Sequence, residues 1–274
     1  LSFGVGRKNN ETVEHDLFND TAWNIDFHRE SPNIKKTARE QLGTIGSGNH
    51  YVDVFRDEED YIWIGVHFGS RGLGHKTASH FMKLAGDNLN NMDDKPNLLD
   101  GNSVQGQNYI TAMLLAGRFA YAGRDLVCEK VAKISGAEIT EEIHNHHNFA
   151  WKEKLHGKDV IVHRKGATPA ATGTLGIIPG SMLDPGYIVR GKGHEAAINS
   201  ASHGAGRQMS RTQGNKTFTM GCLKKLLKTN GIELIGGGPD EAPGVYKDIE
   251  KVMAHQEHLV EKLGKFYPKI VRMA

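Results

Sequence analysis

The chain has 274 residues, of which 38% are hydrophobic and 24% charged, and its formal net charge is +2. These values describe an ordinary globular protein that can bury a sizeable core, and they give no bulk electrostatic reason to expect nucleic acid binding. No run of about 18 apolar residues is present, which excludes a membrane-spanning helix. Cys128 and Cys222 form neither a zinc motif nor a disulfide framework, so we expect a cytoplasmic protein.

The first half of the chain alternates short elements with glycine-rich turns. Its residue pattern predicts, in chain order, a short helix over 33–42, a strand over 51–55, an acidic turn over 57–60, a second strand over 61–67 that runs into a glycine loop at 69–74, a helix over 75–92, a polar loop over 93–106 and a long amphipathic helix over 107–134. His50 and His67 should therefore lie on or beside neighbouring strands.

The second half contains the longest glycine-rich segment. The pattern predicts a strand over 158–168, this glycine segment over 176–211, a helix over 222–228, a Gly/Pro loop over 236–244 and a last helix over 246–264 that ends at Gly264. Neither an internal repeat nor a shift in composition marks a boundary. We therefore expect one α+β domain over residues 1–274, with mixed sheets and peripheral helices.

Glycine is the compositional outlier, with 33 of 274 residues, about 12% against the usual ~7%. Glycines or asparagines accompany four histidine-bearing turns: GSGNHY at 46–51, GVHFGSRG at 65–72, HNHHN at 144–148 and SHGAGR at 202–207. A single histidine near a strand end is usually structural, but imidazole also ligates transition metals, and four such turns favour a metal or phosphate site. If HNHHN is extended, His144 and His146 share a face and His147 points the other way, so spacing alone does not choose among them.

Arginines follow or flank the same glycine turns and strands. They are Arg71, Arg164, Arg190, Arg207 and Arg211. Guanidinium groups suit bidentate contacts with phosphate, and scattered surface arginines are the alternative. Beside glycine turns and histidines, phosphate recognition is the interpretation that we favour.

The segment over 176–211 is the part around which we expect the site to form. His203 stands among small residues, and glycine turns allow a ligand to approach the backbone while amide groups bind phosphate oxygens. A histidine held there can attack phosphorus and form a covalent intermediate. A tight glycine turn with a structural histidine is the alternative that this segment alone leaves open.

Eight segments together resemble the RtcB-type RNA ligases. They are GTIGSGNHYVDV, VHFGSRGLG, EEIHNHHN, VIVHRKGATPA, GIIPGSM, YIVRG, SHGAGRQMSR and DEAPGVYKDI, in the family's order from about residue 41 onward. The resemblance implies a ligase that joins RNA ends bearing a 2',3'-cyclic phosphate or 3'-phosphate to 5'-hydroxyl RNA ends, as in tRNA splicing and RNA repair. It also implies GTP, two Mn²⁺ ions per site, a GMP–histidine intermediate, RNA and an activating protein as partners, no membrane, and an RtcB-like fold around a polar active-site cleft.

The resemblance assigns site residues by position. It implies that His203 is the guanylated histidine, and that His50, His67 and His147 are metal ligands that converge although they are far apart in the sequence. The GTP-binding residues would be Asn49, His50, Tyr51, Val52, Asp53, Asn148, Pro179, Gly180, Ser181, Met182, Gly204, Ala205 and Gly206, with Arg71 and Arg207 at the phosphates. His144 and His146 would then be supporting or structural residues.

The chain also departs from the family's pattern. The family's aspartate and bridging cysteine metal ligands are expected upstream of residue 1, and because the chain begins with Leu1 we expect an N-terminally truncated representation of the ligase. The family's final Lys-Gly is absent from the end of this chain, a serine before the YIVRG-like strand is Gly186, and a glutamate is Asp53. A metal-dependent phosphatase or nuclease, or a non-catalytic phosphate- or RNA-binding relic, is therefore the alternative function.

Overall fold

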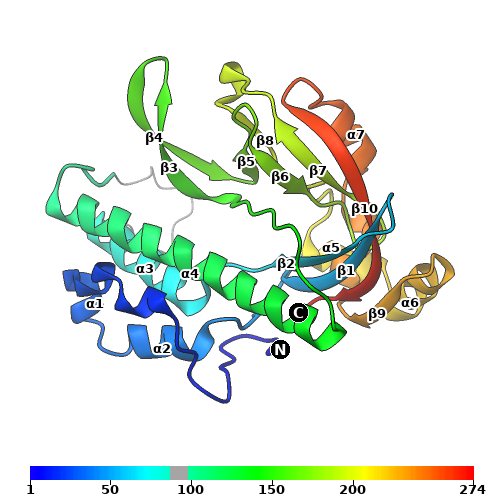
Figure 1. Cartoon of the computed structure of the whole chain (residues 1–274), viewed down its shortest axis with the longest axis horizontal. Helices are drawn as coiled ribbons and strands as arrows, with labels where there is room; N and C mark the ends of the chain where they lie inside the picture. Colours follow the sequence, from blue (N-terminus) through cyan, green and yellow to red (C-terminus); the bar gives the residue numbers. More distant parts are fainter. Residues whose placement is uncertain (87–97) are drawn as a thin grey trace. The chain divides into compact units, whose positions relative to one another are not determined.

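The computed structural model describes residues 1–86 and 98–274, and Figure 1 shows the order of its helices and strands. The chain divides into two compact units. Unit 1 contains Leu1–His50, Val66–Val131 and Ala274, and unit 2 contains Tyr51–Gly65 and Ala132–Met273. The α+β class expected from the sequence is confirmed, and the assignment of residues 1–274 to one domain stays a prediction.

Unit 1 consists mainly of helices. They are α1 (Asp26–Arg29), α2 (Ile34–Gln41), α3 (Arg71–Leu84) and most of α4 (Val104–Ser135), preceded by two short 3₁₀ helices over Asp16–Asn19 and Thr21–Asn24. Their core gathers aromatic side chains that are distant in the sequence, including Phe18, Trp23, Phe81 and Phe119. Trp23 Nε1 donates a hydrogen bond to the carbonyl of Leu17, which satisfies the polar atom of this buried ring.

A six-stranded sheet runs through unit 2 in the order β2-β1-β10-β7-β6, and β9 also pairs with β10. Its strands are β1 (Tyr51–Asp57), β2 (Ile62–His67), β6 (Leu175–Ile178), β7 (Gly186–Gly191), β9 (Glu233–Gly236) and β10 (Val260–Arg272). β10, red in Figure 1, is antiparallel to β1 and β7 and parallel to β9, so the last strand of the chain holds the sheet together.

Two small sheets and three helices complete unit 2. The sheets pair β3 (Asn148–Leu155) with β4 (Lys158–Lys165) and β5 (Ala167–Pro169) with β8 (Ser200–Ser202), and the helices are α5 (Arg211–Thr217), α6 (Met220–Thr229) and α7 (Ile249–Ala254). Short 3₁₀ helices lie at Glu195–Ala197, Pro239–Glu241 and Pro243–Val245. The start of α5 is fixed by a capping box, in which Ser210 and Gln213 each bond the other's backbone N–H.

The predicted last helix over 246–264 is wrong beyond its first part. α7 covers only Ile249–Ala254, and β10 begins at Val260. Apolar residues in this stretch have helix-like spacing, but strands on both sides supply backbone partners for it, and tertiary pairing outweighs local pattern. Gly264, expected to end the helix, instead follows a register shift at Lys262 in the pairing with β7, where glycine suits a bulge.

The glycine loop predicted at 69–74 is also shorter than expected. α3 already begins at Arg71 and ends at Leu84, and the remainder of the predicted helix over 75–92 lies largely outside the described residues. The predicted polar loop over 93–106 lies partly outside them too, and its last residues belong to α4, which begins at Val104. The long helix predicted over 107–134 is confirmed.

Within residues 1–86 and 98–274, no helix has both the length and the apolar character needed to cross a membrane.

Candidate functional site

Unit 1 brings His50 and His67 close together. His50 ends the glycine loop before β1, His67 ends β2, and their ring centroids lie 5.9 Å apart. β1 and β2 are adjacent in the sheet, so the prediction that these histidines lie on or beside neighbouring strands is confirmed.

The hydrogen bonds of His50 indicate which ring nitrogen carries the proton. Its Nδ1 lies 2.7 Å from the carbonyl oxygen of Ile45 and 3.4 Å from Nη1 of Arg71. The carbonyl can only accept and the guanidinium can only donate, so the two partners favour different tautomers. The shorter contact favours a protonated Nδ1 that donates to Ile45, which places the lone pair on Nε2, as coordination of a metal through Nε2 requires.

Arg71 lies beside this histidine pair as a half-buried cation. Its Nε donates to Thr44 Oγ1 at 3.4 Å, and a Cβ at Gly46 would overlap its guanidinium, so the glycine loop makes room for it. Burial lowers the pKa of Arg71, and among the described residues no charged neighbour contributes to that shift. A guanidinium that none of the described carboxylates compensates suits an anion such as phosphate.

In unit 2, His203 is held by the backbone of Gly166. β5 and β8 pair with Ala167 opposite Ser202, so the residues next to that pair, Gly166 and His203, face each other. His203 Nδ1 lies 2.8 Å from the Gly166 carbonyl oxygen, and Gly166 has a φ of 73°, which favours glycine. Because a carbonyl only accepts, Nδ1 carries the proton and Nε2 the lone pair, which is the nucleophilic form of the ring at Nε2.

The same glycine connects His203 with the HNHHN segment. The Gly166 N–H donates to the His147 carbonyl at 2.9 Å, and the rings of His147 and His203 are 4.8 Å apart. The other two histidines have different neighbours: His146 stacks on Phe149 with centroids 4.8 Å apart, and His144 Nε2 lies 3.7 Å from Glu142 Oε2. Of the three, His147 is therefore the one that stands beside His203.

The glycine segment forms the other side of the His203 loop. The Ala205 N–H donates to the Pro179 carbonyl at 3.1 Å, and a Cβ at Gly204 would come within 3.1 Å of the same oxygen. Ser202 N–H donates to Gln256 Oε1 at 2.9 Å, which ties the loop to the end of α7. Pro179, Gly204 and Ala205 thus lie in one group with His203.

Other predicted members of this segment have structural contacts. Ser181 Oγ donates to Asp184 Oδ2 at 2.6 Å and also accepts from the backbone N–H groups of Leu183 and Asp184, while Met182 is buried in the core. A Cβ at Gly180 would lie 2.4 Å from the carbonyl oxygen of Pro185, so this turn requires glycine.

The arginines after His203 converge on one buried carboxylate. Glu241 is 2% exposed, and its oxygens lie 3.3 Å from Arg207 Nη1 and 2.5 Å from Arg211 Nη1. Arg211 also pairs with Asp240 at 2.5 Å, and the Tyr246 hydroxyl donates to Glu241. The segment over 240–246 therefore fixes the backbone that follows the His203 loop, and the Gly206 carbonyl accepts from Lys247 N–H at 2.9 Å.

The predicted nucleotide residues Tyr51, Val52 and Asp53 lie on β1, and Asn49 lies in the turn before it. Asp53 is 4% exposed, and its Oδ1 accepts from the backbone N–H of Arg272 at 2.7 Å. Burial raises the pKa of Asp53 to about 7, against the opposing effect of that hydrogen bond. Burial, and secondarily the charge of Asp53, raises the pKa of Tyr51.

Two of the arginines singled out in the sequence are committed to other contacts. Arg164 is 4% exposed and forms a two-pronged ion pair with Glu153 at 2.6 and 2.9 Å. Arg190 forms an exposed pair with Glu261 at 3.2 Å. These two arginines therefore do not support phosphate recognition.

The sequence profile of the family described as "tRNA-splicing ligase RtcB" matches residues 3–273. The chain belongs to the RtcB family. It is similar to the Escherichia coli (strain K12) protein named RNA-splicing ligase RtcB, with 38% identity over 80% of this chain and 58% of the relative. It is also similar to the tRNA-splicing ligase RtcB of Methanococcus maripaludis, with 33% identity over 87% of this chain and 61% of the relative. The chain thus spans about three fifths of the length of these curated relatives.

In this RtcB-family chain the predicted site residues fall into two groups. His50, His67 and Arg71 gather in unit 1, and His147 and His203 gather with Pro179, Gly204 and Ala205 in unit 2. Across the part of the chain that the structure describes, no group of three or more His, Cys, Asp or Glu side chains could hold a metal ion. Convergence of the three histidines at one metal stays a prediction.

Sequence reasoning missed Gly166, Glu241 and Gln256. The RtcB-like segments DEAPGVYKDI and VIVHRKGATPA contain two of them, so the motifs were the available signal, but nothing local indicates which side chain they contact. Gln256 follows α7 in a stretch predicted to be helical, and its contact with Ser202 spans 54 residues of sequence.

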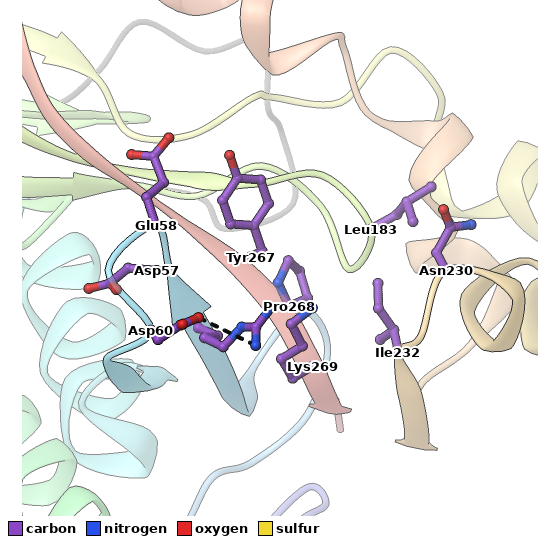
Figure 2. A pocket seen from close by; sticks show the side chains of 10 residues that line it. Asp57, Glu58, Asp60, Leu183, Asn230, Ile232, Tyr267, Pro268 and Lys269 are labelled. Carbon is purple, nitrogen blue, oxygen red and sulfur yellow. Dashed lines mark ion pairs between the residues drawn. The ribbon is translucent and has the colours of Figure 1, made fainter.

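A pocket of about 400 Å³ in unit 2 is lined by none of the predicted site residues (Figure 2). Its walls come from the end of β1, the middle of β10 and the residues Leu183, Asn230 and Ile232. Several of its charged groups bind neighbouring groups, since Arg56 pairs with Asp60 at 3.4 Å and Asp57 accepts from Trp63 Nε1 at 2.7 Å. Nothing in this chemistry favours a nucleotide or an RNA end.

Proposed function

We propose that this chain carries the nucleotide-transfer site of an RNA ligase, which joins an RNA 3'-phosphate or 2',3'-cyclic phosphate end to a 5'-hydroxyl end with GTP. Family membership and the names of its relatives support the reaction class. The observation that carries the proposal is the hydrogen bond from His203 Nδ1 to the Gly166 carbonyl, 2.8 Å long. The proposal includes RNA with such ends as substrate and a cytoplasmic location.

The reaction has three steps in this proposal. His203 Nε2 attacks the α-phosphorus of GTP, so a P–N bond forms and pyrophosphate leaves. An oxygen of the RNA 3'-phosphate then attacks the same phosphorus, the P–N bond breaks, and GMP passes to the RNA. Finally the 5'-hydroxyl loses its proton, attacks the activated 3'-phosphate and displaces GMP; a cyclic phosphate would first open by hydrolysis to the 3'-phosphate.

The Gly166 carbonyl has two roles in the first step. It fixes the ring so that Nε2 carries the lone pair, and its dipole stabilises the positive charge that the imidazole ring gains when the P–N bond forms. The orientation of the carbonyl is set by β5, β8 and the bond from the Gly166 N–H to His147.

Cations would offset the charge that builds on phosphorus. Arg71 is the strongest candidate, because none of the described carboxylates neutralises it. Arg207 pairs with Glu241, and Arg211 pairs with both Glu241 and Asp240, so these carboxylates fix the two guanidinium groups beside the His203 loop. We assign both arginines to contacts with the phosphates.

The proposal keeps His50, His67 and His147 as manganese ligands. Their donor chemistry fits, since neutral imidazole is a suitable ligand and the bond of His50 to Ile45 places the lone pair on Nε2. Manganese, when bound, would neutralise phosphate charge and activate the attacking oxygens. Asn49, Tyr51, Val52, Asp53, Asn148, Pro179, Gly180, Ser181, Met182, Gly204, Ala205 and Gly206 are kept as GTP-binding positions in the same proposal.

The test is an RNA-joining assay with one RNA ending in a 3'-phosphate, a second beginning with a 5'-hydroxyl, GTP and Mn²⁺. We expect a joined product from the protein, none from His203→Ala, and an unchanged yield from His258→Ala, an exposed histidine of the same unit. Loss of the end phosphate or cleavage of RNA without GTP would replace the ligase by a phosphatase or nuclease. RNA that binds and stays unchanged would indicate a binding protein.

A further inference from the structure

The β3–β4 hairpin has one face toward solvent and one toward the protein. Pairs on the outer face are Asn148 with Lys165, Ala150 with His163, Lys152 with Ile161 and Lys154 with Asp159. All of these residues except Ala150 are exposed. Because directly opposed residues share a face of a sheet, the eight form one continuous surface, here called the lysine face.

The lysine face is positively charged. It holds Lys152, Lys154 and Lys165 against one carboxylate, that of Asp159, which lies 3.6 Å from Lys154 Nζ. Among the described residues, the ion pairs within 4 Å that involve β3 or β4 are Lys154–Asp159 and Arg164–Glu153, and neither Lys152 nor Lys165 takes part in one. Both members of the Lys154–Asp159 pair are highly exposed, with 78% and 86% of their side-chain surface accessible, so this pair is weak and easily exchanged.

The opposite face anchors the hairpin. Arg164 lies over the Trp151 ring, 4.9 Å from its centroid, and pairs with Glu153. Its Nε also donates to Ser200 Oγ at 2.8 Å, and Ser200 begins β8, the strand that leads directly into His203. The hairpin is therefore attached by its inner face to the strand that carries the proposed nucleophile.

The lysine face begins at that nucleophile. Lys165 immediately precedes Gly166, whose carbonyl holds His203, and the Asn148 opposite Lys165 immediately follows His147. From there the two strands extend for eight residues each, or roughly 26 Å at ~3.3 Å per residue. A polyanion whose end lies at His203 can follow the row of lysines outward.

We propose that the lysine face binds the phosphodiester backbone of the RNA strand whose end reacts at His203. This rests on the proposed ligase function, from which RNA is the partner that carries a row of negative charges into this site. The contacts are mainly electrostatic and independent of base sequence, since the face presents three ammonium groups and, apart from the imidazole of His163, no aromatic ring for stacking.

The test is the salt dependence of binding to a single-stranded RNA with a 3'-phosphate. For Lys152→Gln/Lys154→Gln we expect about tenfold weaker binding at low salt and a slope of log K against log salt that is smaller by about 1.4, or 0.7 per lost phosphate contact. The matched control is Lys224→Gln/Lys225→Gln, two exposed lysines on α6, which should change neither quantity. Asp159→Asn should act in the opposite direction and strengthen binding, an effect that misfolding cannot produce.

Equal affinities and slopes for the protein and the Lys152→Gln/Lys154→Gln variant would overturn the proposal. Transfer of GMP from GTP to the protein needs no RNA, so it is measured on the same preparations. If the unmodified protein takes up no GMP but its RNA affinity still depends on Lys152 and Lys154, the ligase function fails and the lysine face stands. If GMP transfer occurs but these lysines do not affect RNA binding, the ligase function stands and the lysine face fails.

Discussion

Glu241 is a carboxylate almost without solvent contact, and it faces two guanidinium groups. Arg207 and Arg211 lie 3.3 and 2.5 Å away, and both come shortly after His203 in the sequence. A buried carboxylate between two arginines offsets their mutual repulsion, and it makes the position of each arginine depend on the other. The motif DEAPGVYKDI was recognisable in the sequence, but this role required the contact across about 30 residues to be seen, because no local pattern encodes it.

Replacement of this carboxylate by an amide tests its structural contribution. We expect Glu241→Gln to lower the free energy of unfolding by about 2–3 kcal/mol, because the two arginines lose their shared counter-charge. The control is Glu261→Gln, which breaks the exposed pair with Arg190 and should cost less than about 1 kcal/mol. Urea denaturation of both variants gives the comparison, and equal losses would show that Glu241 has no special role.

Asp53 makes stability depend on pH. Its pKa is raised to about 7 by burial, so between about pH 4 and pH 7 the folded protein binds a proton that the unfolded chain has released. Stability should therefore fall as pH rises through this window and become flat above it, with a total effect on the order of 4 kcal/mol. Asp53→Asn removes the titration while its amide oxygen can still accept from Arg272.

Urea denaturation of the protein and of Asp53→Asn across pH 4 to 8 measures this effect. We expect the difference in unfolding free energy between the two to grow with pH in favour of the asparagine variant. Parallel curves for the two proteins would mean that Asp53 is ionised without cost in the folded state.

At the scale of elements, β10 decides the fold of unit 2. It pairs with β1, β7 and β9, and other elements separate each of these strands from β10 in the sequence. Local patterns predicted β1, β2, β4, α2, α4 and α6, since each has a clear period or a cap. They failed for β10, because its residues become a strand only when neighbours supply backbone hydrogen bonds.

Gly186 on β7 explains one departure from the family's pattern. A Cβ at this position would lie 2.2 Å from the ring of Phe266, its partner on β10, so the aromatic ring covers the glycine. We expect Gly186→Ser to lower the unfolding free energy by about 1–3 kcal/mol, because the ring must move. Gly264→Ser, where a Cβ would meet nothing within 4 Å, should cost clearly less.

Thermal or urea unfolding of these two variants measures the difference. If the clash with Phe266 is the cause, adding Phe266→Leu to Gly186→Ser should cost less than the sum of the two single changes. Additive losses would show that the serine is unfavourable for another reason.

At the scale of the whole molecule, the residues predicted for the site are distributed over both compact units. Unit 1 supplies His50, His67 and Arg71, and unit 2 supplies His147 and His203. The eight motifs and their order predicted the family correctly. Each motif consists of particular side chains and glycines that can be read directly from one sequence. The packing that holds them depends on long-range contacts such as Ser202 with Gln256, which a single sequence does not display.

The identity of the covalent nucleophile is the central claim, and mapping the modified residue tests it most directly. The protein is incubated with Mn²⁺ and GTP labelled at the α-phosphate, then digested, and the labelled peptide is identified by mass spectrometry. We predict one GMP on His203 through an acid-labile, alkali-stable bond, the same product from His258→Ala, and none from His203→Ala. Label on a lysine or on another histidine, or label retained by His203→Ala, would contradict the account.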